Sequence, residues 1–512
     1  MTQKNLTVVR IPLRRAKHHF GACSMRGSRP YNEDADQAGT LDIPAFAKRA
    51  PVSVRQKPGE ATPADSALGD PQIFYFGIFD GHGGMQCSEF LRDELHGYIE
   101  EAATEFGLQS SLRKEKLGRQ DKPPSASVTS TSSVPTQSGG MTRAKAFDAI
   151  DMKSPKEVKE NMNVPDQDEH GVVHSPKHGK PLESADTIPM EVQDRSKTLS
   201  LERNLIQEYK DTVGGYFRRF NPEHFDLADE EGGAEAGSSV EAALTFAFLR
   251  ADLDFIAAQA RKRDPDDPRV GDAPLNNDEI LGVPHAPPSG HGIGGQTRFK
   301  GGSTASVCLI STPTPTPFWH PGTQSTLIVV HVGDTRVLLC DTATGLAQPL
   351  TSDHHPSTPM ESRRLRRYAP AGSMVSSDSF GEDRIAGLAN SRAFGDMRSK
   401  RIGVSAEPEI TRVEMKPAQY SFLVLMSDGV SGTLSDQEIV DVIKEAKTPE
   451  QGARNVVAYA TEVSEDGDNA TCQVIRLGGW ERRSEGGVGS LGTKEIRDIR
   501  KAEAEDPRRG KR

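Results

Sequence analysis

A short apolar stretch that runs into an acidic, glycine-rich turn is the feature that most constrains this chain. Residues 73–79 (IFYFGIF) have the length and composition of a buried strand, and Asp80-Gly81-His82-Gly83-Gly84 follow directly. Glycines there let the backbone turn sharply and bring its carbonyl groups close to a ligand. A carboxylate and exposed carbonyls at a strand end suit a hard cation such as Mg²⁺ or Mn²⁺. An ordinary strand-to-helix turn is the competing interpretation.

Acidic residues recur beside other predicted strands. The apolar residues 422–426 lead into Asp428, Asp468 lies just before the strand predicted over 470–475, and Glu33 adjoins Asp34. Neighbouring side chains on a strand point to opposite faces, so one of Glu33 and Asp34 can reach a cation while the other supports it.

If these strand ends meet in one cleft, Glu33, Asp80, Asp428 and Asp468 would repel one another unless cations lie between them. The pattern therefore predicts a two-metal site, with ions about 3.5–4 Å apart that share a bridging carboxylate. Arg29, four residues before Glu33, offers a planar fork for a phosphate group.

The remaining periodicity favours an α+β fold with antiparallel sheets, because the strands occur in hairpin style and the helices are grouped. Residues 333–335 are predicted to form the turn of a hairpin. Strands are predicted over 304–310, 327–332, 336–340, 421–426 and 470–475, and helices over 90–102, 201–220, 240–260, 437–446 and 451–461.

Part of the chain is predicted to be disordered, since the mean hydropathy is −0.57 and only 35% of residues are hydrophobic. Residues from about 107 to 198 form a polar insertion without a core-forming pattern, and about 263–300 form a Pro/Gly-rich loop. Residues 481–512 are expected to be a charged, disordered tail. The domain proper is therefore predicted over 18–480, interrupted by these segments.

Charge and cysteine usage exclude several classes. A net charge of −10 argues against a nucleic-acid binder. The five cysteines are scattered without a C-x-x-C pair, which indicates a reducing compartment and no zinc cluster. No apolar run approaches the roughly 18 residues that a transmembrane helix requires.

The N-terminus is basic: residues 1–17 contain Lys4, Arg10, Arg14, Arg15 and Lys17 and no acid. This composition is typical of a mitochondrial presequence, and also of a short basic arm. Both interpretations stay open at this point.

Nine motifs, in order, give the chain a resemblance to the type 2C family of metal-dependent protein serine/threonine phosphatases. The resemblance covers about residues 20–477, apart from the insertions. The motifs are Arg29-x-x-x-Glu33-Asp34, Phe79-Asp80-Gly81-His82-Gly83-Gly84, Gly302-Ser303-Thr304-Ala305, Val332-Gly333-Asp334-Thr335-Arg336, Asp353-His354-His355-Pro356, Leu388-Ala389-Asn390-Ser391-Arg392-Ala393-Phe394-Gly395-Asp396, Glu407-Pro408-Glu409, Ser427-Asp428-Gly429 and Asp468-Asn469.

The resemblance implies a four-layer sandwich of two antiparallel β-sheets flanked by helices. It implies two Mg²⁺ or Mn²⁺ ions, with Asp80 as the bridging ligand. Glu33 and the Gly81 carbonyl would complete one metal site, and Asp428 and Asp468 the other, with Asp34 in support. Arg29 would bind the phosphoryl oxygens and His82 would protonate the leaving oxygen.

One position departs from the family pattern. A third, weaker metal near Asp334 is often helped by an acid four residues after the aspartate that corresponds to Asp428, and this chain has Gly432 there. The third site is therefore left open. The pair His354-His355, which could pass for metal ligands, is expected to be structural.

Two alternatives compete with a phosphatase. A non-catalytic family member would bind a phosphoprotein without hydrolysing it, but no core ligand is lost. A two-metal hydrolase of nucleic acid is disfavoured by the acidic charge and the lack of a basic, aromatic-lined patch.

We expect a monomer that acts on phosphoproteins. The long insertion resembles a mitochondrial, fungal-type branch of the family, so a mitochondrial location is expected, with a cytoplasmic one as the alternative.

Overall fold

The computed structural model describes residues 19–49, 70–112, 195–227, 239–264, 285, 287–288, 292–367, 375–377, 383–464, 466–487 and 489–504. The predicted arm over 1–17 lies outside these ranges. So do residues 113–194 of the predicted insertion and residues 265–284 of the predicted Pro/Gly-rich loop.

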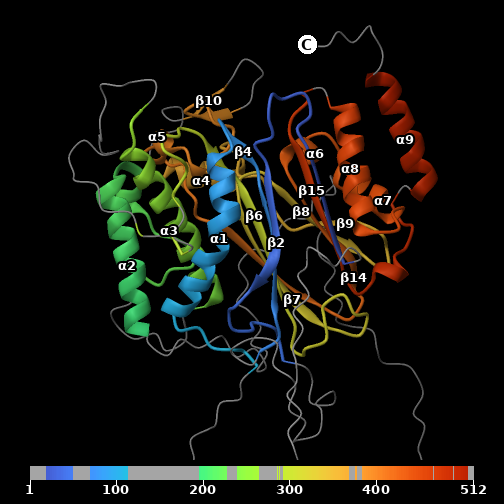
Figure 1. Cartoon of the computed structure of the whole chain (residues 1–512), viewed down its shortest axis with the longest axis horizontal. Coiled ribbons are helices and arrows are strands. Elements are labelled where there is room, and N and C mark those ends of the chain that lie inside the picture. Colours follow the sequence, from blue (N-terminus) through green and yellow to red (C-terminus); the bar gives the residue numbers. More distant parts are fainter. Residues whose placement is uncertain are drawn as a thin grey trace, which may run out of the picture. The chain divides into compact units, whose positions relative to one another are not determined.

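Two five-stranded antiparallel sheets form the centre of the described part of the chain (Figure 1). The first sheet has the order β13-β7-β6-β3-β2, with strands β13 (Glu409–Met415), β7 (Ser325–Val332), β6 (Ala305–Ser311), β3 (Ile73–Phe79) and β2 (Ala35–Leu41). The second has the order β1-β15-β14-β8-β9, with strands β1 (Phe20–Met25), β15 (Ala470–Arg476), β14 (Tyr420–Met426), β8 (Arg336–Asp341) and β9 (Ala347–Pro349).

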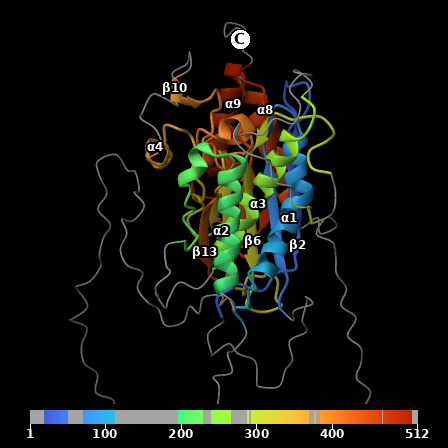
Figure 2. The same ribbon diagram turned by 90° about the vertical axis from the view of Figure 1, so that its left-hand side faces the viewer.

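Helices cover the outer face of each sheet, which confirms the predicted α+β sandwich of four layers (Figures 1 and 2). Three helices lie on the side of the first sheet: α1 (Gln86–Glu105), α2 (Arg195–Thr212) and α3 (Val240–Ala260). Three lie on the side of the second sheet: α7 (Asp436–Lys444), α8 (Pro449–Val463) and α9 (Gly489–Ala504).

Strand β3 shows how the layers are held together. Its side chains alternate, so Tyr75 and Phe79 pack in the cluster under α1 and α3, whereas Phe76 and Ile78 face the other sheet. Leu423 and Leu425 of β14 join Phe76 and Ile78 in the core between the sheets. Burial on both faces explains why residues 73–79 read as a continuous apolar run.

Short elements surround this frame. They are β4 (Gly81–His82), β5 (Gly302–Ser303), β10 (Val375–Ser377), β11 (Asp383–Ile385), β12 (Phe394–Gly395), α4 (Pro359–Arg366), α5 (Met397–Lys400), α6 (Asp428–Ser431) and the 3₁₀ helices η3 (Gly215–Arg219) and η4 (Trp480–Arg482).

The helix predictions hold, with one division. Helix α3 has the predicted bounds, and the Ser239 hydroxyl accepts a hydrogen bond from the Ala242 amide at 3.3 Å as its N-cap. The stripe predicted as one helix over 201–220 is instead divided between α2 and η3. Gly214 and Gly215 separate them with φ angles of 64° and 56°, which an α-helix cannot contain.

The predicted hairpin at residues 333–335 is wrong. The turn is present, but β7 before it belongs to the first sheet and β8 after it to the second. The chain crosses between the sheets at Asp334, and the two strands never pair with each other. A short turn between two apolar runs does not specify whether those runs share a sheet.

The C-terminal segment also differs from the prediction of a disordered tail. Residues 489–504 form α9, where Thr493 is buried and Arg500 forms an ion pair of 3.1 Å with Glu438 of α7. The charged composition did not indicate a helix, because charged side chains of α9 form ion pairs with residues of α7 and α8. Among the described residues, no helix has the length and apolar character to cross a membrane.

Candidate active site

The acidic residues meet because five strand ends lie at the same edge of the two sheets. In the first sheet, pairing of Ile78 with Ser306 and of Ala305 with Val332 aligns the end of β3 with the end of β7. In the second, Met426 pairs with Arg336, which aligns the end of β14 with the start of β8. Strand β15 starts beside the end of β14, so all these ends come together.

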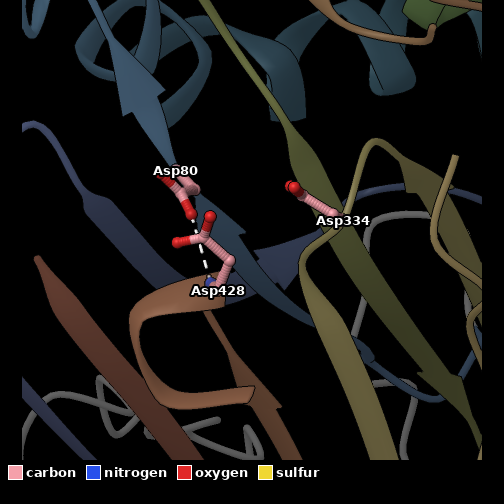
Figure 3. A group of neighbouring side chains, drawn as sticks. All are labelled: Asp80, Asp334 and Asp428. Carbon is pink, nitrogen blue, oxygen red and sulfur yellow. Dashed lines mark hydrogen bonds between the residues drawn. The ribbon is translucent and has the colours of Figure 1, made fainter. Parts of the chain in front are cut away.

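Asp80, Asp334 and Asp428 form the centre of this edge (Figure 3). One carboxylate oxygen of each lies within 4.8 Å of the others. The Asp428 amide donates a hydrogen bond of 3.2 Å to Asp80 Oδ2. Asp80 comes from the first sheet, Asp428 from the second, and Asp334 from the crossing between them.

Burial and mutual repulsion raise the pKa values of two of these carboxylates, Asp80 and Asp428. Burial raises the pKa of Asp80 well above its usual range, and the charges of Asp428, Asp34 and Asp334 raise it further. Burial, with Asp334 and Asp468, raises the pKa of Asp428 to about 7. The pKa of Asp334 is instead lowered, because hydrogen bonds from His355 and Asn390 outweigh its burial.

Asp34 lies behind the cluster. Its Oδ2 accepts hydrogen bonds from the Ser427 hydroxyl at 2.8 Å and the Thr471 hydroxyl at 2.7 Å. Its other oxygen is buried without a hydrogen-bond partner. Burial raises the pKa of Asp34 to about 6, although these hydroxyls work in the opposite direction.

Glu33 points toward the glycine-rich turn, and its carboxylate accepts a hydrogen bond from the Gly84 amide. The Glu33 amide donates to Asn469 Oδ1 at 2.7 Å, which ties it to the start of β15. Gly81 is required here for packing, because a Cβ atom would lie 2.5 Å from the Glu33 carbonyl oxygen.

Two predicted site residues bind each other. Arg29 Nη2 lies 2.8 Å from Asp468 Oδ2, and both side chains are partly exposed. The residue expected to hold phosphate thus pairs with a residue expected to hold metal.

His82 has a partner that the sequence did not reveal. Its Nε2 lies 2.9 Å from Asp396 Oδ2 and 3.0 Å from Oδ1. The His82 side chain is 38% exposed, whereas that of Asp396 is 4% exposed. Burial lowers the pKa of His82, but the hydrogen bond and charge of Asp396, with Asp334 and Glu33, outweigh it and leave the pKa raised.

A small sheet brings this pair together. Strand β5 lies between β4, which carries His82, and β12, which leads into Asp396. Gly302 of β5 is needed for the approach, because a Cβ atom there would lie 2.3 Å from Asp396 Oδ2. Asp396 itself has a φ of 46°, in the left-handed region that a non-glycine residue rarely adopts.

Buried charges fix the turn before Asp396. The Gly395 amide donates to Asp252 Oδ1 at 2.9 Å, and Lys400 forms an ion pair of 2.8 Å with Asp252 Oδ2. Both charged side chains are fully buried. Tyr209 of α2 also donates to Asp252, at 3.1 Å.

The paired histidines support the turn between the sheets, as expected. His354 Nδ1 accepts a hydrogen bond of 2.9 Å from the Gly333 amide. His355 Nε2 lies 3.7 Å from Asp334 Oδ2. Neither belongs to the acidic cluster itself.

The cluster has the chemistry of a divalent-cation site. All its ligand atoms are carboxylate oxygens, which Mg²⁺ and Mn²⁺ prefer. The raised pKa values of Asp80 and Asp428, and the unpartnered Asp34 oxygen, are costs that positive charge at this edge would remove.

Comparisons with known proteins agree. The family profile described as Protein phosphatase 2C matches residues 294–467. Protein phosphatase 2C homolog 4 of Schizosaccharomyces pombe is 29% identical over 478 residues, which is 93% of this chain and 84% of that protein. Mitochondrial protein phosphatase 1K of Xenopus laevis is 35% identical over 180 residues, which is 35% of this chain and 44% of that protein. A serine-threonine phosphatase 2C structure from Toxoplasma gondii superposes with a TM-score of 0.44 at 16% identity, covering 90% of this chain and 94% of that one.

The motifs, the acidic cluster and these relatives together define a metal-dependent protein serine/threonine phosphatase. The chain is similar to protein phosphatases of type 2C, both in the profile match over residues 294–467 and in the relative that is 29% identical over 93% of the chain.

Proposed function

We propose that this chain hydrolyses phosphoserine and phosphothreonine in proteins, with water as the nucleophile and two Mg²⁺ or Mn²⁺ ions as cofactors. The observation that carries the proposal is the meeting of Asp80, Asp334 and Asp428 within 4.8 Å at one edge of both sheets. His82, which follows Asp80 by two residues, supplies a proton donor at the same edge.

Asp80 would be a ligand common to the two cations, because its carboxylate lies with those of Asp334 and Asp428. Glu33 and the Gly81 carbonyl would complete one site, and Asp428 and Asp468 the other, with Asp34 orienting them from behind. Bound there, the two cations would offset the charge of the phosphate and lower the pKa of a water molecule that attacks it. Asp334 would hold a third ion, or share one of these two.

Arg29 would bind the phosphoryl oxygens. It is held by the exposed end of Asp468, 2.8 Å away, rather than by a buried partner. Asp468 would be held by a bound cation, and the guanidinium fork of Arg29 would then be available to a phosphate, which it matches in a bidentate manner.

His82 would protonate the leaving seryl or threonyl oxygen. Its Nε2 faces Asp396, so Nδ1 is the nitrogen left for the substrate. The raised pKa of His82 favours the doubly protonated ring that a general acid needs. Asp396 orients the ring and does not touch the substrate.

Hydrolysis of a phosphoserine peptide by the purified chain tests this function. We expect activity with Mn²⁺ or Mg²⁺, none with EDTA, and recovery when metal is added back. A chain that binds the metal and the peptide but releases no phosphate would be a non-catalytic family member.

We also propose a mitochondrial location. The acid-free residues 1–17 and the mitochondrial relative from Xenopus laevis support it. Residues 1–30 fused to a fluorescent protein should enter mitochondria. A diffuse cytoplasmic signal would instead favour a plain basic arm.

A further inference from the structure

Six exposed arginines gather on three short elements, one of which begins at the active site. They lie on η3, α4 and α5, and Asp396, the partner of His82, is the N-cap of α5. We call this surface the arginine face and define it by Arg218, Arg219, Arg363, Arg366, Arg367 and Arg398, together with Met360.

Printed contacts hold these elements side by side. The Tyr216 amide of η3 donates a hydrogen bond of 2.8 Å to the Arg401 carbonyl, just after α5. The Arg364 guanidinium of α4 lies 5.3 Å from the centroid of the Tyr216 ring and donates to the Gly403 carbonyl at 2.7 Å. The three elements therefore form one surface rather than three separate ones.

Helix α4 shows that its arginines point outward together. Glu361, Arg364 and Leu365 face the body, where Glu361 and Leu365 are buried. The positions on the opposite side, at i, i+3, i+6 and i+7, are Met360, Arg363, Arg366 and Arg367, all exposed. Met360, 61% exposed, adds an apolar side chain to this surface.

Among the described residues, the six arginines differ from several other arginines in forming no ion pair. Arg250, Arg412 and Arg500 each form an ion pair with a glutamate. Within the described part of the chain, no ion pair is formed by any arginine of the arginine face. The buried acids nearby, Glu361 and Glu407, are already bonded to α4 and to the Glu223 amide.

Resting on the proposed function, we propose that the arginine face binds acidic or additionally phosphorylated residues that flank the target phosphoserine of a protein substrate. Arginine and methionine are both enriched at protein interfaces, and arginine matches carboxylates and phosphates. An extended anionic surface such as a membrane or a duplex is less suitable, because the chain as a whole carries a net charge of −10.

The test compares two phosphoserine peptides that are identical except for flanking Glu or Gln residues, with p-nitrophenyl phosphate as a small substrate. We expect the wild type to prefer the Glu peptide. Arg363→Glu with Arg367→Glu should lower kcat/KM for that peptide about tenfold, through KM, since the contact binds ground and transition states alike. The Gln peptide and p-nitrophenyl phosphate should change less than about twofold, as expected of a charge remote from the reaction.

Arg454→Glu with Arg482→Glu is the matched control, because both arginines are exposed on the side of the second sheet. It should leave the preference intact. Arg218→Glu with Arg219→Glu repeats the test on η3, in case the α4 variant does not fold.

Several outcomes would overturn the proposal. Equal loss on both peptides, or no preference in an active wild type, would show that the face does not read flanking acids. Binding of the wild type to anionic vesicles or RNA that only the α4 variant loses, without a peptide preference, would assign the face to those partners. A wild type inactive on p-nitrophenyl phosphate with Mn²⁺ would instead contradict the proposed function itself.

The chain's own acids give one more outcome. Asp229, Glu230, Glu231 and Glu235 follow η3 and lie outside the described residues. If the preference appears only after these four are replaced by Asn or Gln, the face serves this internal segment, and the proposal for substrate is wrong.

Discussion

The imidazole of His82 and the carboxylate of Asp396 lie 2.9 Å apart although 314 residues separate them in the chain. The backbone next to Asp396 is fixed by the buried Asp252. This carboxylate accepts a hydrogen bond from the Gly395 amide and forms an ion pair with Lys400. An orienting carboxylate of this kind sets both the direction and the protonation of the ring that it contacts.

Asp396→Asn should therefore impair catalysis without affecting metal binding. The amide keeps a similar shape but loses the charge that favours the protonated ring. We expect kcat on a phosphoserine peptide to fall by about 10–10³, less than or equal to the loss for a missing acid. The loss on an aryl phosphate should be much smaller, since its leaving group needs little protonation. Mn²⁺ affinity by titration calorimetry is the control, and a loss there would make Asp396 a structural residue of the metal site.

The double variant is a stricter version of this experiment. If Asp396 acts only through His82, then adding Asp396→Asn to the His82→Ala variant should lower kcat little further. Multiplicative losses would mean that the two residues act independently.

Variants of the proposed metal ligands and of the proposed general acid should differ in how their activity depends on the leaving group of the substrate. Asp80→Asn removes a charge at the centre of the cluster, so we expect loss of metal binding and of activity toward every ester. His82→Ala should keep metal affinity and lose about 10²–10⁴ on phosphoserine peptides, with far less loss on an aryl phosphate. An equal loss on both substrates would rule out His82 as the acid.

Asp334 is expected to matter despite Gly432. Its carboxylate lies with those of Asp80 and Asp428, so Asp334→Asn should raise the Mn²⁺ concentration needed for half-maximal activity. The maximal rate at saturating Mn²⁺ then distinguishes a weak third ion from a shared ligand. An unchanged metal requirement would mean that Asp334 acts only through its contacts with His355 and Asn390.

Removal of metal should give the fold an unusual pH response. The pKa of Asp34 is raised to about 6 and that of Asp428 to about 7, against 3.8 for an ordinary aspartate. The folded state therefore binds more protons than the unfolded one between pH 3.8 and 7, and stability falls as the pH rises through that range. In EDTA, the midpoint of urea unfolding should rise as the pH is lowered from 7.5 to 5. With saturating Mn²⁺ this dependence should shrink, and an identical slope in both would contradict the assignment.

Glu361 should behave in the opposite sense. Its burial raises the pKa, but Arg364 and Arg392 outweigh that effect and hold the pKa far below the ordinary 4.5. Its contribution is present above pH 4.5 and is lost as the pH falls below that value. Glu361→Gln should cost about 3–5 kcal/mol of unfolding free energy at pH 7, because two buried guanidinium groups lose their counter-charge. Ser362→Ala, on the same helix, is the control, and a cost that persists undiminished at pH 3 would point to packing.

The sequence predicted that Asp80 and Asp428 would lie close together, but it did not predict the surroundings of His82. Asp80 and Asp428 follow apolar runs, and a run that ends in an acid places that acid at a sheet edge. Asp396 escaped notice as a partner of His82 because the contact depends on β4, β5 and β12. Each of these strands is two residues long, too short for any periodicity.

The error at residues 333–335 has a related cause. Strands β7 and β8 join different sheets instead of pairing with each other. This depends on the core between the sheets, which involves residues far apart in the chain. Asp334 therefore lies deeper in the site than a hairpin tip would. The sequence carried the acid, and tertiary packing decided its position.

The acidic residues of the site come from both sheets and from the connection between them at Asp334. Their spacing therefore depends on the relative position of the two sheets. Asp80 and Asp428 follow strands of different sheets, which are joined face to face mainly by apolar side chains such as Phe76, Ile78, Leu423 and Leu425, with a few hydrogen bonds such as that from Gln473 to Asp36. A slip of one residue, about 3.3 Å, would be comparable to the 4.8 Å span of the ligand atoms. The apolar core between the sheets thus sets the distances between the acidic residues of the site. A smaller side chain in this core, far from any carboxylate, should therefore lower the affinity for Mn²⁺.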